Sequence, residues 1–315
     1  MIGKNAVVRF EGIHHVTCIT ADAPRNVDFY SRLLGLRLVK KSVNQDDPTV
    51  YHLFYADEKG SAGSDLTFFE YPTATPGRAG DGMVHTIVFR AGSEAALDFW
   101  AERLGGDGVD TKREGDRLRF ADFEGLEFEL VVDQTNDEPL IAEHPEIPAE
   151  VAIRGFDAVR AYSSRPDASR RLLEEALAFE PRGENEWEVR GKKRGSFYAY
   201  DPPPPEAGIQ GAGTVHHVAW ACPPDEHEAW RERVLKAGAH PTPVIDRFYF
   251  KSVYFREPSG VLFEIATIGP GFTIDEPFEL LGEKISLPPD YEHLRDQIEP
   301  VLTPLPNPRE HWSVR

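Results

Sequence analysis

Short apolar runs that fit buried strands recur four times along the chain, and each is followed by a segment with apolar residues at helical spacing. In the first copy, Val27, Tyr30, Leu33 and Leu34 share one side of the expected helix. Further β-rich runs follow each helix. The pattern predicts four βαβββ units, here called modules 1 to 4, whose first strands are residues 12–19, 83–90, 156–163 and 214–221.

Each expected helix has a residue that favours a helix start, and Pro and Gly mark the turns between strands. The helix-start residues are Asp22, Ser93, Asp167 and Asp225. Helices packed on one side of a sheet leave its other side facing a concave space. We therefore expect an α+β fold in which the four βαβββ modules form two open, barrel-like curved mixed sheets.

Pro-rich stretches separate the modules and suggest a division into domains. We expect an N-terminal domain over residues 1–142 with modules 1 and 2, and a C-terminal domain over residues 143–270 with modules 3 and 4. The remainder, residues 271–315, is Pro-rich and acidic and should be an irregular tail. Modules 1 and 4 contain the residues with the strongest chemical signal, so we expect them to face each other around one site.

Charge and cysteine content exclude several classes of function. A formal net charge of −18 argues against a nucleic-acid partner, which would need a basic face. Two cysteines, Cys18 and Cys222, cannot make a disulfide framework, and the first ten residues are too short and too polar for a signal peptide. No apolar run approaches the roughly 18 residues that span a membrane. We expect a cytoplasmic protein without a membrane partner, and a homo-oligomer is compatible with the sequence.

Two histidine pairs, His14–His15 and His216–His217, stand in the first strands of modules 1 and 4. Glu264 is the one carboxylate of another apolar strand, where an unpaired buried charge would be costly. Side-chain alternation lets His217 and Glu264 point into one concavity, and His15 joins them if modules 1 and 4 face each other. Two imidazoles and one carboxylate form the facial triad that holds non-haem iron(II) and leaves positions open for substrate and O2.

A histidine in a strand is more often structural, but repetition of the pair at equivalent module positions favours a metal site. Module 2 offers a rival site, because His85 and Glu129 stand in its strands. Module 3, however, has Asp157 where a histidine would be needed. Glu70 is the counterpart of Glu264 by rough alignment, and a fourth protein ligand would suit an isomerase better than an oxygenase.

The segments GIHHVT, TVHHVAW, DRFYFKSVYFREPSG and LFEIAT together resemble the vicinal-oxygen-chelate superfamily, most closely its ring-cleaving hydroquinone dioxygenase branch, which is related to extradiol dioxygenases and glyoxalases. The resemblance covers about residues 10–270. It implies iron(II) held by His15, His217 and Glu264. The catalytic or substrate-contacting residues that it implies are His14, Thr17, His216, Arg247 and Tyr254.

Side-chain alternation along the strands gives these residues a second, independent interpretation. Thr17 shares a strand face with His15 and can line the pocket, although Thr is also simply a good β-former. Alternation points His14 and His216 away from their ligand neighbours. They reach the site only through a strand end, a bulge or the seam between modules.

Arg247 either pairs with Asp246 at the surface or presents its charge to a phenolate or carboxylate. Tyr254 either donates a hydrogen bond toward the site or bonds a backbone carbonyl in the core. The triad, together with what the resemblance implies, favours an iron(II)-dependent dioxygenase that opens the ring of a hydroquinone-type or catechol-type diol with O2. The alternatives are a glyoxalase-like isomerase or thiol transferase with a redox-inert metal and, with less support, a metal-free ligand-binding protein of the same fold.

Overall fold

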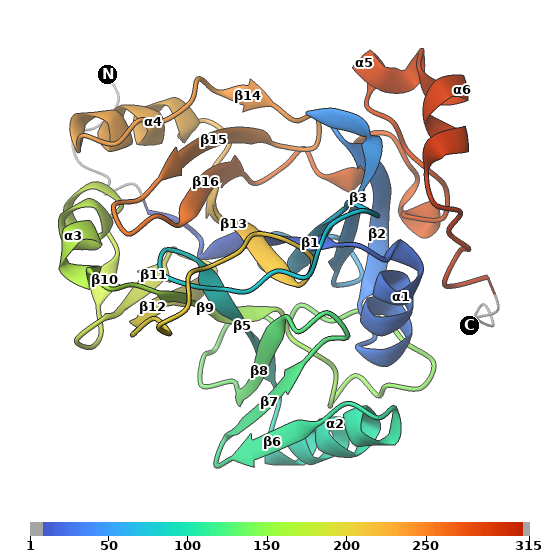
Figure 1. Cartoon of the computed structure of the whole chain (residues 1–315), viewed down its shortest axis with the longest axis horizontal. Coiled ribbons are helices and arrows are strands. Elements are labelled where there is room, and N and C mark those ends of the chain that lie inside the picture. The colour runs from blue at the N-terminus through green and yellow to red at the C-terminus, as the bar shows by residue number, and fades with distance from the viewer. Residues whose placement is uncertain (1–8, 311–315) are drawn as a thin grey trace.

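The computed structural model describes residues 9–310 and contains two eight-stranded mixed sheets with short helices beside them (Figure 1). The strands are β1 (Ile13–Thr20), β2 (Arg37–Asn44), β3 (Asp47–Ala56), β4 (Asp65–Glu70), β5 (Val84–Ala91), β6 (Thr111–Glu114), β7 (Arg117–Ala121), β8 (Glu127–Val132), β9 (Phe156–Tyr162), β10 (Glu180–Pro181), β11 (Glu186–Arg190), β12 (Gly195–Asp201), β13 (Thr214–Cys222), β14 (Ile245–Asp246), β15 (Lys251–Arg256) and β16 (Leu262–Thr267). The helices are α1 (Ala23–Val27), α2 (Glu94–Gly106), α3 (Pro166–Arg171), α4 (His227–Lys236), α5 (Pro289–Glu292) and α6 (Arg295–Ile298), and the shorter or wider helical turns are η1 (Asp28–Leu33), η2 (Leu172–Ala176), η3 (Phe272–Ile274), η4 (Phe278–Leu280) and η5 (Glu299–Val301).

Each sheet combines two modules, and the first combines the two that are most distant in sequence. Its order is β14-β15-β16-β13-β1-β4-β3-β2, so modules 4 and 1 share it. The second sheet has the order β10-β11-β12-β9-β5-β8-β7-β6 and combines modules 3 and 2. The two modules of each sheet meet through an antiparallel pair, β1 with β13 and β5 with β9. The predicted fold class is confirmed, while the expected domain boundary after residue 142 stays a prediction.

Alternation along β1 decides which side chains are left for a site. Val16 and Cys18 are fully buried in the main hydrophobic core, on the side of the sheet that the helices cover. Tyr30 of η1 packs in the same core, with its ring centroid 4.6 Å from that of Phe68 on β4. His15 therefore points to the opposite, concave face of the sheet, because side chains alternate between the two faces along a strand.

Helix starts follow the expected residues in two of four cases. The side chains of Asp22 and Ser93 cap their helices by accepting hydrogen bonds from backbone N–H groups, as predicted. The predictions for the other two were wrong. Helix α3 begins at Pro166, whose fixed φ suits the first helical position and leaves Asp167 inside the first turn. Helix α4 begins at His227, so Asp225 lies outside it.

The expected irregular tail consists of short helical turns joined by loops, and it runs along the edge strand β2 (Figure 1). The buried Lys40 of β2 is ion-paired with Asp275 at 2.7 Å and with Glu276. Lys41 forms a bridge with Ile285 of the tail. The tail thus covers a strand edge that would otherwise be open. Within residues 9–310, no helix has the length and apolar character needed to cross a bilayer.

Candidate metal centre

Three potential metal ligands converge on the concave face of the first sheet. The Nε2 atoms of His15 and His217 lie 3.1 and 2.9 Å from the same Oε2 atom of Glu264, and 3.2 Å from each other. Strand register explains the approach, because Ala219 pairs with His15 on one side and with Glu264 on the other. All three side chains are almost completely buried.

The surroundings of Glu264 fit a bound cation. Neither carboxylate oxygen makes a hydrogen bond of normal geometry within the described chain, although both are buried. Burial acts to raise the pKa of Glu264, but the imidazoles of His15 and His217 hold it well below its usual range. A carboxylate and two ring nitrogens that crowd together in this way are a ligand set for a divalent metal.

A β-bulge lies at each histidine pair. On β1 the register shifts between Ile13 and His15, so His14 is an extra residue without a partner on β13. The shift on the opposite strand leaves His216 as the extra residue. The bulges keep the His14 ring beside the His15 ring and the His216 ring beside the His217 ring. The Nδ1 atoms are 3.0 Å apart in the pair of module 1 and 2.8 Å apart in the pair of module 4.

His14 determines which nitrogen of His15 is available to a metal. Burial, and then the neighbouring His15 ring, lower the pKa of His14 to about 3, so its ring is neutral. Its Nε2–H donates to the backbone carbonyl of Thr267 at 3.2 Å, because a carbonyl can only accept. The Nδ1 atom of His14 must then accept the N–H at Nδ1 of His15. The lone pair on Nε2 of His15 is left for the metal.

His216 holds the same place beside His217. Burial and the His217 ring lower the pKa of His216 to about 3, so this ring is also neutral. Burial likewise lowers the pKa of His217. Its Nε2 faces Glu264, so its Nδ1 is free to bond His216. Both first histidines therefore contact a predicted ligand rather than the cavity.

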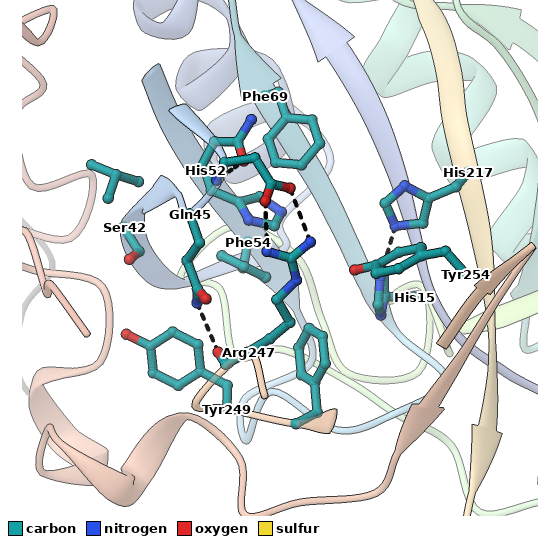
Figure 2. Close-up of a pocket in the computed structure, with 14 residues that line it drawn as sticks. His15, Ser42, Gln45, His52, Phe54, Phe69, His217, Arg247, Tyr249 and Tyr254 are labelled. Carbon is teal, nitrogen blue, oxygen red and sulfur yellow. Dashed lines mark hydrogen bonds and ion pairs between the residues drawn. The ribbon is translucent and has the colours of Figure 1, made fainter. Parts of the chain in front are cut away.

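A cavity opens beside the ligands, between β2, β3 and the segment that leads into β15 (Figure 2). Its walls are His15, Ser42, Val43, Asn44, Gln45, Asp46, His52, Phe54, Phe69, His217, Arg247, Tyr249, Phe250 and Tyr254. Of the predicted site residues, these include both ligand histidines, Arg247 and Tyr254. Thr17, His14 and His216 lie behind the wall.

Thr17 contributes through a hydrogen-bonded chain. The Thr67 hydroxyl on β4 donates to the Thr17 hydroxyl at 2.8 Å. Because the Thr67 hydroxyl proton is used in this bond, the imidazole N–H must be the donor in the 2.9 Å hydrogen bond between Nε2 of His52 and Thr67. His52 thus carries its proton on Nε2, and the lone pair on its Nδ1 has no hydrogen-bond partner among residues 9–310. Burial lowers its pKa well below the usual range, so the ring is neutral.

Reasoning from the sequence did not single out His52. Its ring lies between Phe54 and Phe69, with centroid distances of 3.9 and 4.4 Å, at the cavity wall (Figure 2). It is a lone histidine in a strand with no paired neighbour. Alternation within YHLFYA would have placed it on the same face as Phe54, but the facing of β3 toward the ligands comes only from the sheet order.

Arg247 and Tyr254 lie together at the cavity. The guanidinium of Arg247 pairs with Asp46, at 3.1 and 2.9 Å, and not with Asp246. Asp246 instead accepts a backbone N–H of its own turn. The guanidinium also lies 5.5 Å from the centre of the Tyr254 ring, and Tyr254 pairs in register with Glu264. Burial raises the pKa of the Tyr254 phenol, which keeps its proton.

His85 and Glu129, the rival residues of module 2, belong to no cluster of potential metal ligands among residues 9–310. On β13, Ala219 lies beside Glu264, two residues after His217. On β5, the residue beside Glu129 is Val88, two residues after Thr86. Thr86, and not His85, therefore occupies the ligand position.

His85 is the extra residue of the bulge on β5, like His14 on β1. Its Nε2 bonds Asp201 at 3.0 Å and its ring stacks on Tyr162. The partner bulge on β9 leaves Asp157 as the extra residue, and the following Ala158 stands at the second ligand position. Neither ligand position of the second sheet holds an imidazole.

Register also corrects the alignment of Glu70. Thr17, two residues after His15, lies beside Thr67 on β4, so Thr67 is the module 1 counterpart of Glu264. Glu70 instead accepts the backbone N–H of Ala23 at 3.1 Å. The position of a fourth protein ligand is thus occupied by a hydroxyl that is already hydrogen-bonded.

The chain matches the family described as the glyoxalase/bleomycin resistance protein/dioxygenase superfamily over residues 12–130 and 155–265. It belongs to this superfamily. The superfamily relatives include the Bacillus subtilis (strain 168) protein named "Putative ring-cleaving dioxygenase MhqA", which is 39% identical, with 95% of this chain and 100% of that one covered. The "Chlorohydroquinone/hydroquinone 1,2-dioxygenase" of Sphingobium indicum is 31% identical, with coverages of 92% and 95%.

Solved structures agree with this membership. The crystal structure of a "putative dioxygenase" from Bacillus subtilis superposes with a TM-score of 0.88 at 39% identity, and the match covers 95% of this chain and 98% of the Bacillus chain. Glyoxalase I from Zea mays has a TM-score of 0.55 at 14% identity, with coverages of 81% and 92%. This second similarity concerns the fold alone.

Proposed function

We propose that this chain is an iron(II)-dependent dioxygenase that opens the ring of a hydroquinone-type diol with both atoms of O2. The convergence of His15, His217 and Glu264 beside an aromatic-walled cavity carries the proposal. The relatives named as ring-cleaving dioxygenases support the reaction class. The Sphingobium relative, named as a chlorohydroquinone/hydroquinone 1,2-dioxygenase, supports a hydroquinone as the substrate.

Two imidazoles and one carboxylate on one face suit iron(II), with His15, His217 and Glu264 as the residues that would hold it. Iron(II) bound there would supply the redox chemistry that a reaction between an aromatic diol and O2 requires. Thr67 at the position of a fourth ligand supports an oxygenase over an isomerase, because positions are left for two small ligands.

His52 is suited to take a proton from the substrate. Its Nδ1 lone pair is free, its tautomer is fixed by Thr67, and its ring lies at the cavity wall. A phenolic hydroxyl that reacts must lose its proton, and a neutral imidazole can accept it. A positioned base of this kind typically contributes a factor of about 10²–10⁴ in rate.

Arg247 and Tyr254 are suited to stabilise negative charge on oxygen. The Tyr254 phenol keeps its proton and can donate it in a hydrogen bond, while Arg247 adds a fixed positive charge at the same wall. Phe54, Phe69 and Phe250 give the cavity flat apolar surfaces that fit an aromatic ring and exclude water.

The test is anaerobic reconstitution with iron(II), followed by oxygen-electrode assays on hydroquinone, methyl-hydroquinone, chloro-hydroquinone and catechol. The proposal expects O2 uptake with the hydroquinones that depends on iron. Isomerase or thiol-transfer activity of a zinc or nickel form, with no O2 uptake by the iron form, would support the alternative. Tight binding of aromatic ligands without any metal would support a binding protein.

A further inference from the structure

The hydroxyl of Ser42 on β2 has no hydrogen-bond partner of good geometry among residues 9–310. The residue is 1% exposed, yet it belongs to the wall of the cavity. Its hydroxyl lies beside that of Tyr249 but makes no hydrogen bond of good geometry to it or to another residue within 9–310. Buried polar groups normally have a partner, so this one suggests a ligand.

Ser42 and Tyr249 lie at the far end of the cavity from the ligand histidines. Figure 2 shows the pair on one side of the view and His15 and His217 on the other, with Arg247 between them. The sheet order accounts for this, because β2 is separated from β1 by β4 and β3. Ser42 pairs in register with His52, which continues the cavity wall toward the metal ligands.

Tyr249 can act only as an acceptor. Its hydroxyl donates to Oδ2 of Asp275 at 3.0 Å. The same carboxylate oxygen accepts from Ser286 at 2.6 Å, and Oδ1 accepts from the buried Lys40 at 2.7 Å. Asp275, the ion-pair partner of Lys40, therefore accepts the hydrogen bond that the Tyr249 phenol donates. Only lone pairs of the Tyr249 oxygen remain for a ligand.

We propose that Ser42 and Tyr249 form a subsite for the second hydroxyl of a 1,4-diol. The inference rests on the proposed function, in which the first hydroxyl lies at the metal ligands. Ser42 donates to the oxygen of the distant hydroxyl, and the Tyr249 oxygen accepts its hydrogen. An ether satisfies only Ser42 and leaves Tyr249 without a donor. A 1,2-diol has both hydroxyls at the same end of the ring and leaves the subsite empty.

The test measures dissociation constants in the iron(II)-loaded protein without O2, by calorimetry, for hydroquinone, 4-methoxyphenol and phenol. Ser42→Ala should weaken the binding of hydroquinone and 4-methoxyphenol by about fivefold to tenfold, the usual effect of one lost neutral hydrogen bond, and leave phenol unchanged. Tyr249→Phe should weaken hydroquinone by a similar factor and leave both other ligands unchanged.

Ser31→Ala is the matched control, because Ser31 is also buried with an unpartnered hydroxyl but does not line the cavity. It should change none of the three constants. Equal losses for phenol and hydroquinone, or no loss for either in Ser42→Ala, would overturn the subsite. Absence of O2 uptake by the parent protein would overturn the proposed function instead, and the binding pattern, measured without O2, would still decide the subsite.

Discussion

The two sheets share their strand order and both central bulges, but the buried carboxylate at the equivalent position has different partners in each. Glu129 of the second sheet, 1% exposed, is neutralised by Arg119 at 2.6 Å and by Arg117 at 2.9 Å. Among residues 9–310, Glu264 of the first sheet has two imidazoles and no arginine within ion-pair distance. The backbone is therefore permissive for a metal centre in both sheets, and a few side chains decide between an ion pair and a metal site.

One register position shows this difference most directly. Arg119 pairs across β7 and β8 with Glu129, and Tyr254 pairs across β15 and β16 with Glu264. A buried carboxylate needs a compensating charge. Arg119 supplies it within the protein, whereas a neutral phenol does not. Tyr254 thus leaves Glu264 free for a cation and keeps a hydrogen-bond donor beside it.

The largest effect should come from removing the ligands. His15→Ala, His217→Ala and Glu264→Ala should each abolish retention of iron, because two ligands cannot hold a divalent ion through desalting. Metal analysis after anaerobic reconstitution and gel filtration measures this. His85→Ala and Glu129→Ala are the matched controls in the second sheet and should keep the parent iron content. Loss of iron in these controls would show that the metal binds in the second sheet and not in the first.

Placing an arginine at position 254, where the second sheet has Arg119, should give Glu264 the same ion pair that Glu129 has. Tyr254→Arg would bring a guanidinium to Glu264 and lower the metal affinity by about 10- to 100-fold. Competition with a fluorescent chelator measures the affinity. An unchanged affinity in a folded variant would show that the position opposite the carboxylate does not decide its use.

Tyr254→Phe separates the two roles of this residue. The variant should keep the fold and the iron, while turnover falls on the order of 10²–10³, the usual effect of losing one donor to a developing negative charge. The measurement is kcat at saturating O2 with matched iron content. Equal turnover would mean that the phenol only packs against Arg247 and His217.

Thr67→Val tests the hydrogen-bonded chain that orients His52. The shape is preserved, but the Nε2–H of His52 loses its acceptor, so turnover should fall by about fivefold to tenfold. The iron content should not change, because Thr67 is not proposed as a ligand. A variant that loses iron would show that the hydroxyl binds the metal.

The smallest effect should come from the tail. The Tyr291 hydroxyl donates to the carbonyl of Gln45 at 2.6 Å, and the Gln45 side chain donates to the carbonyl of Arg247 at 2.8 Å. Tyr291→Phe should loosen this wall and raise KM for hydroquinone by about two- to fivefold with little change in kcat. A proportional fall in kcat with constant KM would contradict a positioning role.

The fold and the convergence of the three candidate ligands could be predicted from the sequence because they depend on local periodicity and on repetition. The four modules are visible as a repeated pattern, and both histidine pairs occur at the same place in it. Glu264 stands out because a carboxylate in an apolar strand needs an explanation. These signals do not require knowledge of which strands are neighbours.

The sequence left alternatives open, or missed a residue, where register between strands decides the outcome. A bulge adds one residue, so His85 aligns with His14 and not with a ligand, and rough alignment selected Glu70 in place of Thr67. The partner of Arg247 is Asp46, about two hundred positions away, and not its neighbour. His52 was missed for the same reason, since its place beside the cavity depends on the order β4-β3-β2.

The most direct test of the central claim is the fate of oxygen-18 gas in a single turnover with hydroquinone. The parent protein, loaded with iron(II), should give a ring-opened product that contains two oxygen-18 atoms, as shown by mass spectrometry. Glu264→Ala and the zinc-loaded parent should give none. A product of the iron form with one labelled atom, or with none, would contradict a ring-cleaving dioxygenase centred on His15, His217 and Glu264.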